Sequence, residues 1–274
     1  MKWLQAIRKN LPKHKYAINA QILGDDRELA WSNLGYWEDA TSSYPKACMA
    51  LADQLAQSLE LSSEYALLDL ACGQGASLVH WQHNYQIQNS SAVELQKECV
   101  EKIKSKYPNF VDIHCDSILN LKQIPLQHMF DVAVCIDAAY HCNLNSFLKS
   151  VTSVLNSNGK LGFHYLIFSD EWINLNSLQK QKYKWLLKAA DVNLDNLMMH
   201  QEMKQVLEAN EFSEIQILDL SEQVFAGFSA YVKDVLNLNV NKLDDFKIEM
   251  TAKLCSKLYE DGFVKYVQVT AQKN

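Results

Sequence analysis

The segment at residues 67–79, LLDLACGQGASLV, constrains the fold most: an apolar run enters a turn with two glycines and leaves as an amphipathic segment. Glycine adopts backbone dihedrals that other residues avoid, and it lets a neighbouring group approach the backbone closely. Gly73 and Gly75 therefore either let a strand turn tightly into a helix or make room for a ligand. The turn alone leaves both interpretations open.

Apolar runs typical of buried strands recur along the chain, and segments with helical spacing of apolar residues separate them. The runs occupy residues 65–72, 90–95, 111–117, 130–140 and 160–168. Strands that are buried on both faces and alternate with helices indicate a parallel sheet covered by helices. Two later runs, 214–221 and 265–273, flank a helix predicted near 243–260. The sequence thus predicts an α/β fold with a doubly wound, mostly parallel, seven-stranded sheet.

Two segments lie outside this alternating unit and are expected to cover the sheet. Residues 1–44 are predicted as an N-terminal helical lid, and residues 45–274 as the main domain. Within that domain, residues 171–205 are predicted as an inserted cap, because two helical patterns follow each other there without a strand between them.

Composition excludes several classes of function. The net charge of −6, without a basic stripe, argues against nucleic-acid binding. No apolar run is long enough to span a membrane, and the first residues lack the pattern of a secretory signal. Seven scattered cysteines without a C-x-x-C pair predict reduced thiols in a cytoplasmic protein. The helical spacing of His80 and His83 explains that pair, so we expect no metal site.

Four successive predicted strands end in an acidic residue. These residues are Asp69, Glu94, Asp116 and Asp137. The carboxyl ends of parallel strands share one edge of a sheet, where ligands bind in open α/β folds. Unpaired carboxylates gathered there would repel one another, so a neutral or cationic ligand rich in hydrogen-bond donors would explain them. Solvated loop acids are the alternative.

These segments resemble a known family. D-L-A-C-G-Q-G, then A-V-E-L, H-C-D-S and F-D-V-A-V-C-I-D-A-A-Y-H, in this order and spacing, are similar to the class I S-adenosylmethionine-dependent methyltransferases. The resemblance covers at least residues 64–168. Ala71 departs from it, since many members have glycine there. Dinucleotide binding would require the longer G-x-G-x-x-G, and Leu78 disfavours it.

The resemblance implies a Rossmann-like fold, S-adenosylmethionine as cofactor and S-adenosylhomocysteine as product. It implies that Asp69, Ala71, Gly73 and Gly75 border the methionine part of the cofactor, and that Glu94 binds the ribose. Leu95, Asp116 and Ser117 are expected near the adenine, and Asp137 in the same site. The chain also resembles the small-molecule, type 11-like group, because N-L-G-Y-W-E precedes a helix. In that group an aromatic residue of this segment contacts the cofactor, and Tyr36 and Trp37 are the candidates here.

The acceptor is predicted to be a small, partly hydrophobic molecule with a hydroxyl or an amine, as in natural-product or lipid-like metabolite biosynthesis. Asp137-Ala138-Ala139-Tyr140-His141 differs from the N/D-P-P-Y typical of nucleobase methylation. His141 is the candidate general base or substrate clamp, since imidazole titrates near neutral pH. Tyr140 is a weaker catalytic candidate. Tyr165 stands where some sugar methyltransferases of this type have an acid, which disfavours a sugar acceptor.

A non-catalytic cofactor-binding subunit that regulates a partner enzyme is the alternative function. The sequence leaves open the identity of the acceptor, the choice among oxygen, nitrogen and carbon methylation, and the oligomeric state, for which a homodimer is one option.

Overall fold

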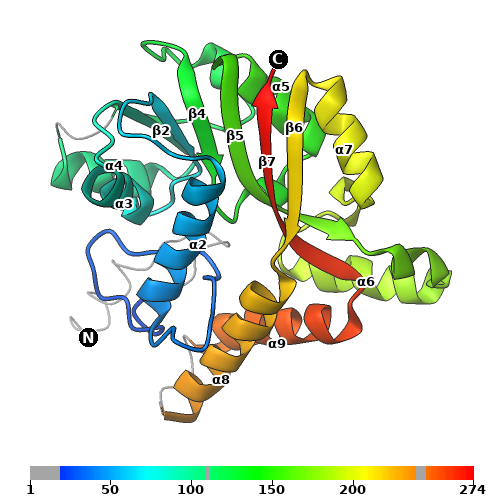
Figure 1. Ribbon diagram of the computed structural model, residues 1–274. Coiled ribbons are helices and arrows are strands. Elements are labelled where there is room, and N and C mark those ends of the chain that lie inside the picture. Colours follow the sequence, from blue (N-terminus) through cyan, green and yellow to red (C-terminus); the bar gives the residue numbers. More distant parts are fainter. Residues whose placement is uncertain (1–18, 109–111, 239–244) are drawn as a thin grey trace.

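The predicted strands meet in one sheet in the computed structural model, which describes residues 19–108, 112–238 and 245–274 (Figure 1). The strands within these residues are β1 (Leu67–Leu70), β2 (Ser90–Glu94), β3 (Asp112–Cys115), β4 (Phe130–Cys135), β5 (Leu155–Phe168), β6 (Phe212–Asp219) and β7 (Val264–Lys273). Their order is β3-β2-β1-β4-β5-β7-β6. The first five are parallel, and β7 runs antiparallel between β5 and β6. The predicted doubly wound, mostly parallel sheet is confirmed.

Helices cover both faces of the sheet. They are α2 (Tyr44–Ser58), α3 (Ala76–Tyr85), α4 (Lys97–Lys106), α5 (Leu144–Thr152), α6 (Ser177–Ala189), α7 (His200–Ala209), α8 (Gly227–Leu238) and α9 (Asp245–Asp261). Leu67 packs in the core cluster beneath α2, whereas its neighbour Leu68 packs in the cluster beneath α5 and α7. Successive residues of a strand point to opposite faces, so both must be apolar in a strand covered on each side.

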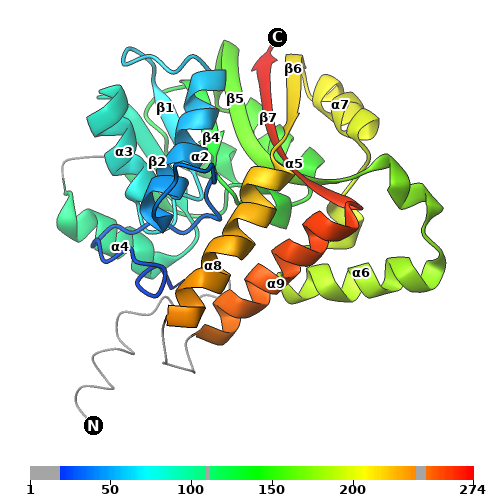
Figure 2. The same ribbon diagram turned by 60° about the horizontal axis from the view of Figure 1, so that its bottom comes forward.

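The carboxyl ends of the parallel strands face a layer of further segments. The N-terminal segment (residues 19–43), α6, α8 and α9 lie at this end, which Figure 2 brings forward. The Tyr231 hydroxyl of α8 donates to the Leu23 carbonyl at 2.9 Å, and the Tyr183 hydroxyl of α6 donates to Asp261 of α9. These bonds join α8 to the N-terminal segment and α6 to α9.

The structure differs from the sequence prediction at three places. Residues 19–43 form turns and extended chain instead of a helix, since Gly24 and Gly35 have positive φ; residues 1–18 of the predicted helical lid lie outside the described residues. Strand β5 begins earlier than predicted, because Asn158 enters the left-handed region without ending the strand. Helix α8 was not predicted. It follows a π-helical turn, Glu222–Ala226, and opens at a glycine, which is a weak helix former.

Candidate functional site

The glycine turn after β1 requires small residues for two reasons. Ala71, Gly73 and Gly75 all have positive φ, at 58°, 57° and 90°. A Cβ on Gly75 would lie 2.8 Å from Cγ1 of Ile103, and one on Gly73 would lie 2.8 Å from Oγ of Ser32. Ala71 adopts the left-handed conformation at a cost of about 1–2 kcal/mol. The turn is therefore closely packed by α4 at Gly75 and by the N-terminal segment at Gly73.

Glu94 at the end of β2 fixes this turn. Its Oε2 accepts the backbone N–H of Gly73 at 2.9 Å, and its Oε1 accepts the backbone N–H of Gln96 at 2.8 Å. The Glu94 side chain is buried. A carboxylate oxygen can accept more than one hydrogen bond. The carboxylate therefore joins the glycine turn after β1 to the residue that precedes α4.

Asp69 belongs to β1, two residues before the turn begins at Ala71, and β1 lies between β2 and β4 in the sheet. Its Oδ2 accepts the indole N–H of Trp81 at 2.7 Å, and the side chain is buried. Burial raises the pKa of Asp69 to about 6, although hydrogen bonds from Ser77 and Trp81 lower it. Asp69 thereby positions α3 against β1.

Asp116 and Ser117 follow β3, beside the end of β2. The Asp116 N–H donates to the carbonyl of Glu94 at 3.2 Å, and Asp116 Oδ1 accepts the N–H of Ser117 at 2.6 Å. Both side chains are partly exposed, and Leu95 is 59% exposed. The structure therefore brings the predicted adenine residues together at one accessible corner of the sheet edge.

Asp137 after β4 is the centre of a buried network. Its Oδ2 accepts the backbone N–H of Leu34 at 2.8 Å, and its Oδ1 accepts the hydroxyls of Tyr140 and Tyr266, each at 2.9 Å. Its φ is 52°, and its own N–H donates to Nδ1 of His164 at 3.2 Å. Burial raises the pKa of Asp137 to about 6, although these hydrogen bonds lower it.

These contacts correct one part of the sequence argument. The strand-end acids are neither unpaired nor merely solvated, because protein donors bind each of them: Asp69, Glu94, Asp116 and Asp137. Their gathering alone does not require a ligand. Among them, Glu94 holds the glycine turn at the carboxyl edge of the sheet, where ligands bind in open α/β folds.

His141 lies next to the network, with its ring 4.5 Å from that of Tyr140. Its Nδ1 is 3.1 Å from the backbone carbonyl of Asp191. A carbonyl can only accept, so Nδ1 carries a proton, and in the neutral imidazole this is the tautomer whose Nε2 has no hydrogen. This tautomer is the one that a general base at Nε2 requires.

Part of the chain matches a known family model. Residues 68–163 match the family model described as a methyltransferase domain. The chain carries a methyltransferase domain. This match and the fold confirm the predicted resemblance to the class I S-adenosylmethionine-dependent methyltransferases. No curated protein sequence matches the chain.

Solved structures share the whole architecture of the methyltransferase. A cyclopropane synthase, MmaA2 from Mycobacterium tuberculosis, is 14% identical with a TM-score of 0.73, over 97% of this chain and 98% of that chain. Geranyl diphosphate C-methyltransferase from Streptomyces coelicolor A3(2) is 13% identical with a TM-score of 0.67, over 96% of this chain and 100% of that chain. A geranyl diphosphate methyltransferase in complex with GPP and sinefungin is 13% identical with a TM-score of 0.74, over 98% of this chain and 99% of that chain. At such identities the likeness establishes the fold.

The two aromatic candidates of the N-terminal segment differ in their surroundings. Trp37 is buried: its ring stacks on Tyr231 at 4.3 Å, and its indole N–H donates to the Leu34 carbonyl at 2.8 Å. It therefore anchors the segment to α8. Tyr36 is partly buried, and its backbone N–H donates to the Ala47 carbonyl at 2.8 Å. Tyr36 remains the candidate of the two for a cofactor contact.

Tyr165 is a structural residue of the methyltransferase. Its hydroxyl donates to the carbonyls of Cys142 and Asn196 at 2.8 and 3.2 Å, within the core on the α5 face. His164 points to the opposite face, as strand alternation predicts. It accepts the N–H of Asp137 there, and burial lowers the pKa of His164 to about 3. His164 is therefore neutral and supports Asp137 from behind.

Three residues of this network were not predicted: Leu34, Asp191 and Tyr266. Two of them contribute backbone atoms, which leave no signal in residue type. Tyr266 belongs to β7, and only the antiparallel insertion of β7 beside β5 brings it to the end of β4. A tyrosine within an apolar strand is by itself a common core residue.

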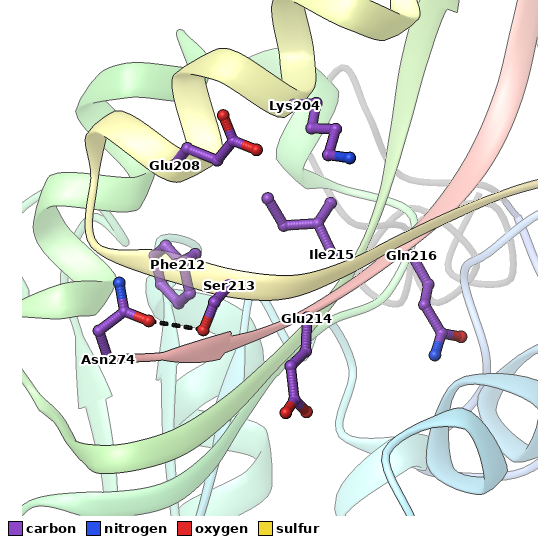
Figure 3. Close-up of a pocket in the computed structure, with 8 residues that line it drawn as sticks. All are labelled: Lys204, Glu208, Phe212, Ser213, Glu214, Ile215, Gln216 and Asn274. Carbon is purple, nitrogen blue, oxygen red and sulfur yellow. Dashed lines mark hydrogen bonds between the residues drawn. The ribbon is translucent and has the colours of Figure 1, made fainter.

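Cavities elsewhere do not include the strand-end acids. An open cavity of about 790 Å³ lies between α7 and the edge strand β6, where Lys204 and Glu208 approach Ile215 (Figure 3). Another of about 410 Å³ lies between α3 and the N-terminal segment, lined among others by Arg27 and His83. Within the described residues, no group of three or more His, Cys, Asp or Glu is arranged to hold a metal ion. No helix of that part of the chain has the length and apolar character needed to cross a membrane.

Proposed function

We propose that this protein transfers a methyl group from S-adenosylmethionine to a small, partly apolar acceptor. The observation that carries the proposal is the glycine turn held by the buried carboxylate of Glu94, inside a methyltransferase domain. The sulfonium cofactor supplies an activated methyl group, which an acceptor lone pair attacks in line with the breaking carbon–sulfur bond. The protein must position the acceptor and take up its proton.

The cofactor side of the proposal follows the strand order. Asp69, Ala71, Gly73 and Gly75 border the methionine part. Glu94, which holds the glycine turn, accepts the ribose hydroxyls. Leu95, Asp116 and Ser117 lie at the adenine corner. The complexes of similar proteins with S-adenosylhomocysteine and sinefungin support the choice of this cofactor.

The acceptor side is formed by His141 and two covering segments. The described part of the predicted lid (residues 19–44 of 1–44) and the predicted cap (171–205) cover this side, because the Leu34 N–H donates to Asp137 and the Asp191 carbonyl accepts from His141. His141 Nε2 removes the proton of a hydroxyl acceptor or clamps an amine. Positioning within such a closed site supplies much of the acceleration. Tyr140 supports His141, since its own hydroxyl is already donated to Asp137.

The apolar character of the acceptor rests on the lid and cap and on the similar enzymes. Leu34, Leu194 and Leu197 lie in or against the core cluster that joins these segments. Two of the similar structures are named for geranyl diphosphate, an apolar chain with a polar end. We therefore place the reaction in the biosynthesis of a natural product or a lipid-like metabolite.

Calorimetric titration of ligand-free protein with S-adenosylhomocysteine, with NADH as control, tests the cofactor. We expect micromolar or tighter binding of S-adenosylhomocysteine alone. Binding of NADH alone, or of neither, contradicts the proposal. An acceptor panel of prenyl alcohols, prenyl diphosphates and amines then follows with S-adenosylhomocysteine formation as the signal. Binding without turnover across the panel would favour a non-catalytic regulatory subunit.

The variants His141→Ala and His83→Ala test the role of His141. His83 is an exposed histidine on α3 and serves as the matched control. If His141 is the general base, kcat falls by about 10²–10⁴-fold, while the Kd for S-adenosylhomocysteine changes little. A rise in KM with kcat preserved would identify a clamp instead. Unchanged kinetics would remove His141 from the site.

A further inference from the structure

Helix α6 presents an apolar ridge to solvent. Leu178 is 83% exposed and Trp185 is 65% exposed. They are seven residues apart, so they lie within about 20° of each other around the helix. Just before α6, Ile173 is 75% exposed. Such large apolar side chains on one outward face are unusual on a protein surface, and they mark an interaction site.

The inner face of α6 packs against the rest of the protein. Tyr183 and Leu187 are buried, the Tyr183 ring meets Phe263 edge-on at 5.8 Å, and its hydroxyl donates to Asp261. Figure 2 shows α6 beside α9 at the end of the molecule beyond the parallel strands. The ridge therefore points away from the core and is not part of the packing between α6 and α9.

Lysines flank the ridge on both sides. Lys182 and Lys188 each lie three residues from Trp185, about 60° to either side of it around the helix. Residues 172–190 contain four lysines and no acid, although the whole chain has a net charge of −6. The Lys188 ammonium lies 5.7 Å from the centre of the Trp185 ring, and Lys184 lies 3.8 Å from Asp195. Helix α6 is thus locally positive, although Asp170, Glu171 and Asp191 lie at the two ends of this segment.

We propose that α6 docks this face onto an anionic lipid surface. A tryptophan and a leucine between lysines have the composition of an interfacial helix: the apolar ridge enters the boundary between headgroups and acyl chains, and the lysines meet lipid phosphates. Tryptophan in particular favours this boundary. The local charge of α6 is complementary to anionic headgroups, although the chain as a whole has a net charge of −6.

Docking would bring the acceptor side of the methyltransferase to the lipid. Asp191, whose carbonyl holds His141, follows α6 after a single residue. A lipid-like acceptor could therefore pass from the surface toward the cap. Only this last step rests on the proposed methyl transfer, since docking itself needs neither cofactor nor turnover.

Co-sedimentation of the full chain with vesicles tests the proposal without any activity measurement. We expect binding to phosphatidylcholine–phosphatidylglycerol vesicles at low salt, and at least about tenfold weaker binding to phosphatidylcholine alone. The double variants Leu178→Ser with Trp185→Ser, and Lys182→Glu with Lys188→Glu, should each weaken binding to the anionic vesicles by at least about tenfold. Their thermal unfolding should match wild type, because all four side chains are exposed.

Matched controls alter the same properties elsewhere. Met129→Ser removes an exposed apolar side chain before β4, and Lys122→Glu with Lys149→Glu makes the same change in net charge near α5. Both should bind vesicles like wild type. Absence of wild-type binding, or equal losses in test and control variants, overturns the proposal. A wild-type dimer in sedimentation velocity that Leu178→Ser with Trp185→Ser dissociates would instead identify a contact between two copies.

Discussion

The backbone N–H of Leu34 donates a 2.8 Å hydrogen bond to Oδ2 of Asp137, which lies 103 residues further along the chain. The other oxygen of the same carboxylate accepts the hydroxyls of Tyr140 and Tyr266. One buried side chain thus joins the N-terminal segment, the loop after β4 and strand β7. We expect this carboxylate to control whether the N-terminal segment stays closed over the glycine turn.

Asp137→Asn should loosen the N-terminal segment. An amide has a single oxygen, so it cannot accept from the two tyrosine hydroxyls and from Leu34 in the present geometry, and an unmade buried hydrogen bond costs about 1–3 kcal/mol. Hydrogen exchange of the amides of residues 29–37 should speed up by at least about tenfold. Asp39→Asn changes an exposed acid of the same segment and is the control. Unchanged exchange in Asp137→Asn would show that the segment is held by other contacts.

Asp137 should make the free energy of unfolding depend on pH. Its pKa is about 6 in the folded protein against about 3.9 in an unfolded chain, so the native state binds more protons between these values. Its contribution to the free energy of unfolding therefore falls as pH rises from about 4 to 6 and is constant above. His164 acts in the opposite sense. Its pKa is lowered to about 3 in the folded protein, so its contribution to the free energy of unfolding rises with pH over the same range.

The two contributions separate in the comparison of wild type with Asp137→Asn. The wild-type free energy of unfolding, measured by urea denaturation across this range, should decline by about 1–3 kcal/mol relative to that of the variant. Parallel curves for the two proteins would contradict the raised pKa of Asp137.

Glu94→Gln should weaken the cofactor site more than it weakens the fold. Glutamine retains one acceptor oxygen for either Gly73 or Gln96 and places an NH₂ group where the other N–H points. We expect the Kd for S-adenosylhomocysteine to rise at least about tenfold, since hydrogen bonds to charged groups contribute about 1.5–3 kcal/mol. Glu98→Gln, at an exposed position of α4, is the matched control. Equal affinities of the two variants would exclude Glu94 from ribose binding.

Gly227→Ala should destabilise the protein strongly. A Cβ at position 227 would lie 2.3 Å from Cβ of Trp37, and neither backbone can move without disturbing the N-terminal segment or α8. We expect a loss of about 2–4 kcal/mol in the free energy of unfolding. Gly262→Ala is the comparison, because that site is open but has a φ of +68°. Its loss should be about 1 kcal/mol, the cost of the left-handed conformation alone. A larger loss for Gly262→Ala than for Gly227→Ala would contradict this assignment.

The first half of the sheet follows from local sequence patterns. Strands β1, β2 and β4 are buried on both faces, so each appears as an apolar run, whereas the edge strand β3 is only partly buried. An acid lies in or just after each of the four strands, and the parallel register brings these acids to the same edge as Glu94. The glycine turn is similarly local: its left-handed residues lie within five positions, from Ala71 to Gly75.

The acceptor side could be predicted only in part, because its contacts span distant segments. His141 was identified as a candidate from its place after β4, yet its tautomer depends on a backbone carbonyl 50 residues away. Tyr266 reaches Asp137 over 129 residues. Trp37 was expected near the cofactor because its neighbours resemble a known segment, but its stacking partner lies on α8, a helix that the pattern did not predict.

The place of β7 between β5 and β6 has a consequence for the order in which the protein is made. Nine residue pairs join β5 to β7, from Lys160 with Gln272 to Phe168 with Val264. A ribosome has already released β5 and β6 into solution while residues 264–273 are still inside its exit tunnel. Until they emerge, one edge of β5 stays open and Asp137 lacks the hydroxyl of Tyr266. The nascent chain therefore needs β7, which is synthesised last of the strands, both to close its sheet and to complete its site. We expect chaperones to bind the chain during this interval, because an open strand edge is then exposed.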